Sequence, residues 1–287
     1  MDVVAQVSAL LGEPVQAARL RGGGITGRTW QVSLASGATV FVKSRGDAPD
    51  GFFAAEVTGL RWLAEVPDGP PVPTVLAHDA RTVVLPWIEA GEPSAAAAAE
   101  LGRGLAQLHA AGAPAFGAAW PGWIGAAPLD NRPAASWPEF YATRRVLPYV
   151  RMLRDAGAID RSGAGRFEQF AARLPELTGP PEPPARIHGD LWGGNVLWAT
   201  DGAGWLVDPA AHGGHRETDL AMLALFGSPY LEQVVAGYVD HTPLAPGWRD
   251  RVALHQVHPL LVHAVLFGGG YLAQAQAATS RYVTADP

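Results

Sequence analysis

The strongest constraint on the fold is the polar segment 188–195, which reads His-Gly-Asp-Leu-Trp-Gly-Gly-Asn. Apolar residues flank this segment, and a second apolar run shortly after it ends at Asp208. The pattern predicts a short hairpin, with Asp190 and Asn195 on the loop that leads into it and Asp208 at its end. Any fold that contains this hairpin can bring three oxygen-bearing side chains together.

These three side chains are the types that phosphoryl transfer from Mg-ATP requires. One carboxylate accepts or orients the proton of the attacking hydroxyl, while a neutral oxygen and a second carboxylate hold the metal against the phosphates. The Asp-x4-Asn spacing equals that of the protein-kinase catalytic loop. Asp190 is therefore the predicted catalytic base, and Asn195 and Asp208 are the predicted Mg²⁺ ligands. The plainer alternative is a polar turn in which Asp and Asn bond only the local backbone.

Lys43 is the only lysine among the 21 basic residues of the chain, and the others are arginine. A lone lysine predicts a position that needs a compact ammonium, for example between phosphate oxygens; chance survival on a strand is the alternative. Glu56 follows within a helix expected over 52–65. A kinase needs such a helix carboxylate to pair with the strand lysine, although a lone helical glutamate is usually just solvated.

Gly22, Gly24 and Gly27 fit the G-x-G-x-x-G pattern of phosphate-covering loops. A dinucleotide-binding loop of this spacing opens into a helix. Here the residues after Gly27 alternate at a period of two and predict a strand, as in a kinase ATP site. A merely flexible hairpin is the alternative.

The chain changes from strand-like to helix-like patterns near residues 86–91. We therefore expect an α+β, bilobal, protein-kinase-like fold, with a small antiparallel-sheet N-lobe over 1–88 and a mainly helical C-lobe over 89–287. At this boundary Leu85 and Trp87 are expected to contact ATP, because Pro86 has no N–H to offer an adenine. Further helices are expected over 95–111, 137–153 and 166–174 and from residue 219 onward, and a loop is expected over 209–216.

Bulk properties narrow the function further. A chain of 287 residues with 48% hydrophobic content can bury a full core, and a net charge of −6 argues against a general nucleic-acid binder. The absence of cysteine excludes a disulfide-linked dimer and thiolate metal sites. We expect a cytoplasmic protein without membrane contact, because a signal-peptide pattern is missing and the most apolar stretch, 252–273, is interrupted by His, Pro and Gly.

The motifs HGDLWGGNVL (188–197), DPAAHGGHRETDLAM (208–222) and LFGGGY (266–271) resemble those of the fructosamine kinase (ketosamine-3-kinase) family, and shorter matches extend over nearly the whole chain. That family is related to aminoglycoside phosphotransferases and choline kinases. The resemblance implies transfer of the ATP γ-phosphate to the 3-hydroxyl of a ketosamine, a fructosyl or ribulosyl adduct of an amine or a protein lysine. Because phosphorylation destabilises the adduct, the implied role is deglycation. Many members carry a cysteine in the glycine-rich loop, which this chain lacks.

The remaining candidates are assigned more loosely. Trp192 can stack on the sugar or the amine, or it can pack in the core. His263 and Glu217 are candidate substrate residues, whereas His188 and Asp219 are expected to brace the catalytic loop. Histidines expected to be structural, or to be substrate candidates of lower rank, are His109, His212, His215, His255 and His258.

Three other functions are compatible with parts of the sequence. An aminoglycoside- or choline-type phosphotransferase on the same fold stays open, although −6 is only mildly acidic for a site that binds polycations. A non-catalytic binding module is disfavoured because every group that a kinase needs is present. A dinucleotide-dependent oxidoreductase is disfavoured by the strand that follows the glycines.

Overall fold

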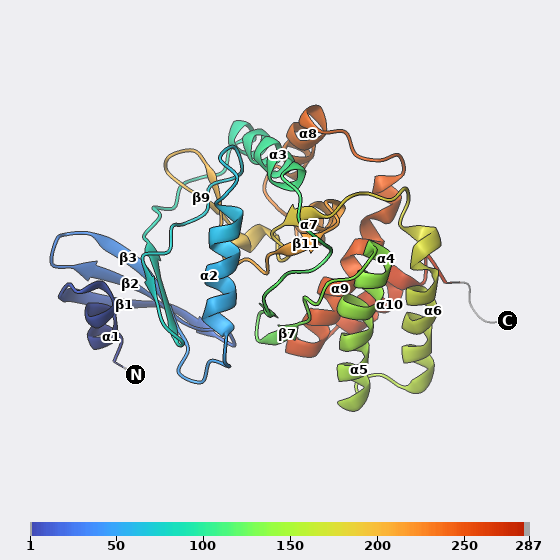
Figure 1. Ribbon diagram of the computed structural model, residues 1–287, viewed down its shortest axis with the longest axis horizontal. Coiled ribbons are helices and arrows are strands. Elements are labelled where there is room, and N and C mark those ends of the chain that lie inside the picture. Colours follow the sequence, from blue (N-terminus) through green and yellow to red (C-terminus); the bar gives the residue numbers. More distant parts are fainter. Residues whose placement is uncertain (1, 284–287) are drawn as a thin grey trace.

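The computed structural model describes residues 2–283 and shows two parts side by side (Figure 1). The first part is built on a five-stranded antiparallel sheet in the order β1-β2-β3-β5-β4. Its elements are α1 (Val3–Leu11), β1 (Val15–Gly24), β2 (Gly27–Leu34), β3 (Thr39–Ser44), α2 (Phe52–Leu63), β4 (Ala77–His78) and β5 (Thr82–Pro86). This sheet with its helices, followed by a mainly helical second part, confirms the predicted α+β bilobal fold.

Both faces of the sheet are covered, which explains why β5 reads as a continuous apolar run rather than an alternating one. Val84 points to one face, in the cluster that includes Val3 and Val7 of α1. Val83 and Leu85 point to the other face, where they pack under α2. The helix α2 consequently lies between the sheet and the second part (Figure 1).

The second part carries most of the helices and three short strand pairs. Its helices are α3 (Ala95–Ala110), α4 (Trp137–Phe140), a π-helical segment (Tyr141–Val146), α5 (Leu147–Asp155), α6 (Arg161–Leu177), α7 (Glu217–Leu225), α8 (Leu231–His241), α9 (Trp248–Phe267) and α10 (Tyr271–Thr279). Its strands are β6 (Gly122–Ile124), β7 (Ala127–Leu129), β8 (Ala185–Ile187), β9 (Val196–Trp198), β10 (Gly204–Leu206) and β11 (His212–Gly214), with a 3-10 turn at Gly193–Asn195. Within the described chain, no helix is long and apolar enough to span a membrane.

Several local predictions are confirmed. The hairpin β9–β10 forms as predicted after the catalytic loop. The Ser94 side chain caps α3 by accepting the Ala97 N–H at 3.1 Å, and Gly112 follows the end of the helix with a φ of 72°, in the left-handed region. Most of the apolar stretch 252–273 lies in the largely buried helix α9, with Pro259 inside it, and the rest forms a turn and the start of α10.

The helix expected over 137–153 is confirmed as a continuous helical run from α4 to α5, in which the segment Tyr141–Val146 is π-helical. Pro148 has no N–H and so cannot continue regular helical bonding, and the guanidinium of Arg145 donates to the Arg144 carbonyl at 3.3 Å. One local prediction is wrong: the loop expected over 209–216 contains strand β11, because its backbone pairs with β8 across the sequence.

Candidate active site

A cavity of about 440 Å³ lies between the two parts of the molecule. The tip of the β1–β2 hairpin, the facing side of α2, the loop after β8 and the end of α9 all contribute to its lining. The predicted site residues that line it are Gly24, Lys43, Glu56, Asp190, Trp192, Asn195, Asp208 and His263. The structure therefore brings together most of the candidates chosen from the sequence.

Asp219 anchors the loop that carries Asp190. Its carboxylate accepts the backbone N–H of His188 at 2.7 Å and that of Gly189 at 3.0 Å, and it lies 3.2 Å from the His109 ring. Burial acts to raise the pKa of Asp219, but the hydrogen bond and charge of His109 outweigh burial and lower it. An ionised, fully buried carboxylate thus fixes two successive peptides of the loop.

His188 links this loop to the end of β10. Its Nδ1 accepts the Asp190 N–H at 3.3 Å, so the neutral ring carries its proton on Nε2 and donates it to the Val207 carbonyl at 3.0 Å. Burial lowers the pKa of His188, which favours this neutral form. The ring therefore holds Asp190 and the residue before Asp208 at a fixed separation.

The carboxyl group of Asp190 is buried and held in place by its neighbours. Burial is the largest of the effects that together raise its pKa to about 8; the nearby charge of Asp208 acts in the same direction, and Asn195 and Lys43 act against it. The Asn195 amide donates to the Asp190 carbonyl at 2.8 Å and to its carboxylate at 3.2 Å. Its carboxylate form is positioned and more basic than a solvated aspartate, as a general base requires.

Lys43 connects three segments of the cavity. Its Nζ lies 3.0 Å from Glu56 on α2 and 3.0 Å from Asp208 after β10, and the lysine is only 5% exposed. Burial acts to lower the pKa of Lys43, but the two carboxylates outweigh burial and raise it. Burial in turn raises the pKa of Glu56 against the charge of Lys43. The lysine is thus a charged, positioned ammonium facing the cavity.

Asn195 and Asp208 have the free oxygens that a magnesium ion would need. The Asn195 Nδ2 is used as a donor to Asp190, which leaves Oδ1 as an acceptor. The Asp208 Oδ1 meets Lys43, but the side chain is still 42% exposed and so retains access for Oδ2. An amide oxygen and a carboxylate are suitable Mg²⁺ ligands, so the residues fit this ion. Asp208 also has a φ of 54°, a strained value for a non-glycine residue, of the kind that clusters at functional sites.

The glycine-rich segment forms a tight hairpin between strands. Gly24 and Gly27 pair across the turn, and of the three predicted glycines Gly24 lines the main cavity. Gly27 has a φ of 121°, and a Cβ there would collide with the Ser44 carbonyl of β3. Gly22 faces the Thr29 hydroxyl within the β1–β2 pair. Gly27 therefore allows β2 to lie close to β3. Gly24 places its backbone at the edge of the cavity.

Leu85 and Trp87 do not line the cavity. Leu85 is buried under α2. The Trp87 N–H donates to the Thr39 carbonyl at 3.2 Å, and its indole donates to Glu89 at 2.9 Å. The expected contact of these two residues with ATP therefore has no geometric support.

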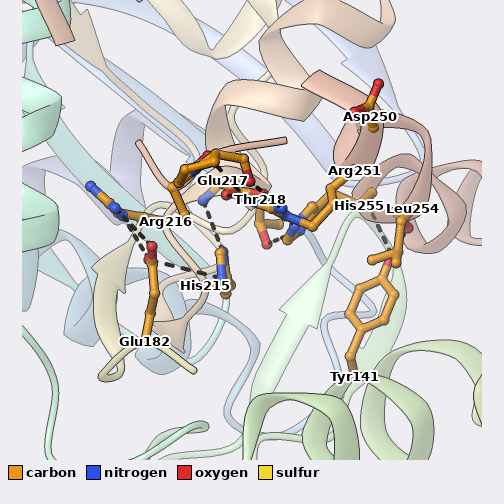
Figure 2. Close-up of polar contacts among 12 residues, drawn as sticks. Tyr141, Glu182, His215, Arg216, Glu217, Thr218, Asp250, Arg251, Leu254 and His255 are labelled. Atoms are coloured by element: carbon orange, nitrogen blue, oxygen red, sulfur yellow. Dashed lines mark hydrogen bonds and ion pairs between the residues drawn. The ribbon is translucent and has the colours of Figure 1, made fainter. Parts of the chain in front are cut away.

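Glu217 also lies outside the cavity, in a buried polar network (Figure 2). Arg251 donates to both of its carboxylate oxygens, at 2.9 and 2.6 Å. Burial acts to raise the pKa of Glu217, but its contacts with His255 and Arg251 outweigh burial and hold the pKa at about 2. With both oxygens bound, Glu217 is an internal ion-pair partner and not a residue facing a substrate.

The same network contains the side-chain types of a metal site. The ligand atoms of His215, Glu217 and His255 lie within 4.8 Å of one another. However, the His215 Nδ1 accepts the Glu217 N–H at 3.2 Å, so in the neutral ring Nε2 carries the proton and has no lone pair for a metal. The cluster is therefore better described as a structural network that joins α7 to α9.

The sequence reasoning missed the hairpin β6–β7, which lines the cavity beside α2 with Trp123 and Gly125. The Trp123 ring lies 5.7 Å from that of Phe52 on α2. The available signal in the sequence was a glycine, Gly125, between two short apolar runs; in the structure it forms the turn with a φ of 55°. The segment was too short and too irregular for a strand prediction.

Comparison with known proteins identifies the family. The model of the family described as fructosamine kinase matches residues 1–285. A protein of Synechocystis named as a probable ketoamine kinase is 35% identical over 286 residues, which cover 96% of this chain and 93% of the relative.

Solved structures agree with this match. A crystal structure from Thermobifida fusca, named as a candidate fructosamine-3-kinase, is 49% identical, with a TM-score of 0.91 and coverage of 98% of this chain and 99% of that one. A macrolide 2'-phosphotransferase from Brachybacterium faecium is 17% identical with a TM-score of 0.62, covers 100% of both chains and shows a shared fold. The chain belongs to the fructosamine kinase family, whose model spans almost all of its length.

Proposed function

We propose that this protein is an ATP-dependent kinase that transfers the γ-phosphate to the 3-hydroxyl of a ketosamine. The observation that carries the proposal is the buried Asp190, whose loop is anchored by Asp219 and whose carboxylate accepts from Asn195, in the same cavity as the Lys43–Asp208 ion pair. Family membership supports the acceptor class, and the cavity supports the phosphoryl chemistry. Deglycation of amines in the cytoplasm, where ATP is available, belongs to the same proposal.

Each group in the cavity has a role in this reaction. Lys43, positioned by Glu56, neutralises the phosphates, and the backbone of the glycine hairpin covers them. Asn195 and Asp208 would hold Mg²⁺, which would supply further neutralisation of phosphate charge. Asp190 orients the acceptor hydroxyl and takes its proton; because the transition state is loose, orientation matters as much as basicity.

Two residues of the cavity are proposed to contact the acceptor. Trp192 is 39% exposed and lines the cavity, so its ring is the proposed stacking partner of the sugar or its amine. His263 lines the same region and is the second proposed acceptor contact.

We place the lobe boundary near residue 88, since the sheet ends at Pro86 and α3 begins at Ala95.

A substrate panel with Mg-ATP tests the proposal. The panel contains fructosyl-lysine and ribulosyl-lysine, each free and within a glycated protein, with kanamycin and choline as alternative acceptors. We expect the mass of one phosphate to be added to the ketosamines. Phosphorylation of kanamycin or choline alone would instead support the aminoglycoside- or choline-type phosphotransferase.

Asp190→Ala tests the assignment of the base. We expect turnover to fall by about 10²–10⁴-fold, the usual contribution of a general base, while nucleotide binding measured by calorimetry is retained. The matched control is Asp201→Ala, on the exposed turn of the hairpin β9–β10, which should keep wild-type turnover. Wild-type turnover in Asp190→Ala would remove Asp190 from the mechanism.

A further inference from the structure

Five rings pack together in one cluster, which we call the aromatic wall: Trp192, Phe226, His263, Phe267 and Tyr271. Trp192, His263 and Phe267 line the cavity, and Phe226 and Tyr271 lie behind them. The His263 ring is at its centre, with centroids 4.7 Å from Phe226, 5.1 Å from Tyr271 and 5.4 Å from Phe267. Trp192 joins at its edge, 6.3 Å from Phe226 in an edge-to-face arrangement. Such spacings are those of favourable aromatic pairs, so the rings support one another.

The wall is assembled from several elements by a turn after α9. Gly268 and Gly269 have φ values of 65° and 62°, in the left-handed region that glycine adopts readily. This turn brings α10 back against α9 and places Tyr271 beside His263. The glycines of the motif LFGGGY thus form the turn that brings the Tyr271 ring into the aromatic wall.

The wall carries no positive charge at neutral pH. Burial lowers the pKa of His263, and its Nδ1 lies 2.8 Å from the Pro259 carbonyl, to which it must donate. The neutral form of the ring is therefore favoured, and the wall contains no lysine or arginine. Among the described residues that line the cavity, the one cation is Lys43, which already faces two carboxylates.

Large parts of the wall are open to water. Phe267 is 55% exposed and Trp192 is 39% exposed, and both line the cavity. Exposed aromatic rings that line a cavity indicate a binding surface for an apolar or cationic group. Trp192 follows Asp190 by two residues, so the wall lies next to the proposed base. We therefore expect the wall to contact the acceptor molecule, which presents its hydroxyl to Asp190. The phosphates of ATP are expected at Lys43 and Gly24, which line the same cavity.

We propose that the aromatic wall is the subsite for the amine part of the acceptor and selects apolar and aromatic amine substituents over anionic ones. The inference rests on the proposed function and names the part of the ketosamine that it leaves open. A ketosamine nitrogen is a secondary amine that is protonated at neutral pH, and a cation is attracted to the face of a tryptophan ring. A benzyl or alkyl substituent on that nitrogen then packs against Phe267, whereas a carboxylate there meets ring faces and no free cation.

The test compares fructosamines that share one sugar and differ in the amine: benzylamine, methylamine and glycine adducts. For the wild-type enzyme we expect kcat/KM to be highest for the N-benzyl adduct and lowest for the glycine adduct. Phe267→Ala should lower kcat/KM for the N-benzyl adduct at least tenfold, mainly through KM. The same variant should leave the N-methyl adduct and the KM for ATP within twofold, because neither reaches this ring.

The matched control is Leu76→Ala, which removes an apolar side chain that is 46% exposed and does not line the cavity. This variant should leave the ratio of N-benzyl to N-methyl activity unchanged. Equal losses for both adducts in Phe267→Ala, or a wild-type preference for the glycine adduct, would overturn the subsite while ketosamine phosphorylation stands. If the wild type phosphorylates none of the three adducts, the proposed function itself fails.

Discussion

At the scale of single residues, the protonation of Asp190, the proposed base, also makes the stability of the fold depend on pH. Its folded pKa is raised to about 8 by burial, whereas an aspartate in an unfolded chain has a pKa of about 3.9. Between these values the folded state holds a proton that the unfolded state has lost. The contribution of this group to stability is therefore fully present below about pH 4 and is lost as the pH rises through about 8.

Asp190→Asn removes this titration and keeps the side-chain shape. We expect the melting temperature of the variant, relative to the wild type, to be higher at pH 9 than at pH 6, as measured by thermal unfolding in matched buffers. Asp201→Asn, on an exposed turn, should differ from the wild type by the same amount at both pH values. A constant difference for Asp190→Asn as well would show that its pKa is not raised in the folded enzyme.

Sequence reasoning placed some residues correctly in the cavity. For these residues, the proposed chemistry requires a particular residue type at a particular spacing along the chain. Asp190 and Asn195 share a short loop, and the single lysine, Lys43, was conspicuous by its rarity. Glu217 was misplaced because its partner, Arg251, is distant in the sequence, so nothing local shows that its carboxylate is already used. The aromatic wall was missed for the same reason, since it comes from separate elements.

At the scale of elements, α3 and α8 are brought close together by glycines on both helices. A Cβ at Gly102 of α3 would overlap the Val234 carbonyl of α8, and one at Gly237 of α8 would overlap the Ala99 carbonyl of α3. The helical pattern of the sequence predicted α3 within one residue, yet it gave no sign of this contact. Helix propensity is a local property, whereas the need for glycine here arises from a neighbour distant in the sequence.

Gly102→Ala should lower the free energy of unfolding by about 1–3 kcal/mol, because the added methyl group forces the two helices apart. This loss should exceed the gain of about 1 kcal/mol that alanine brings to a helix. Gly165 of α6 is the matched control, since a Cβ there would meet nothing within 4 Å. Gly165→Ala should therefore stabilise the protein by about 0.5–1 kcal/mol. Urea denaturation of both variants checks this, and stabilisation by Gly102→Ala would contradict the close approach.

At the scale of the whole molecule, the two parts are joined by contacts behind the cavity as well as by Lys43. Arg186 on β8 donates to the Trp62 carbonyl at the end of α2 and pairs with Glu65 at 3.0 Å. Its guanidinium also lies 4.4 Å from the centre of the Trp62 ring. Since α2 carries Glu56, this contact also affects how the lysine is held.

Arg186→Ala should lower the free energy of unfolding by about 1–3 kcal/mol, as expected for the loss of charge-assisted hydrogen bonds, and should raise the KM for ATP. Arg103→Ala is the control, because Arg103 is half exposed and pairs with the exposed Glu100 on the same helix, so its loss should change stability by less than about 0.5 kcal/mol. Denaturation curves and initial rates measure both effects. Equal stability for the two variants would show that Arg186 does not join the parts.

The rarity of lysine affects how readily the protein itself can be glycated. Reducing sugars attack exposed, unprotonated amines, and the one lysine side chain of this sequence is 5% exposed, with its pKa raised by two carboxylates. Every other basic residue is an arginine, so no lysine amine is displayed on the surface. A protein proposed to repair glycated amines therefore presents almost no lysine target of its own, and it can persist in the sugar-rich conditions in which its substrates form.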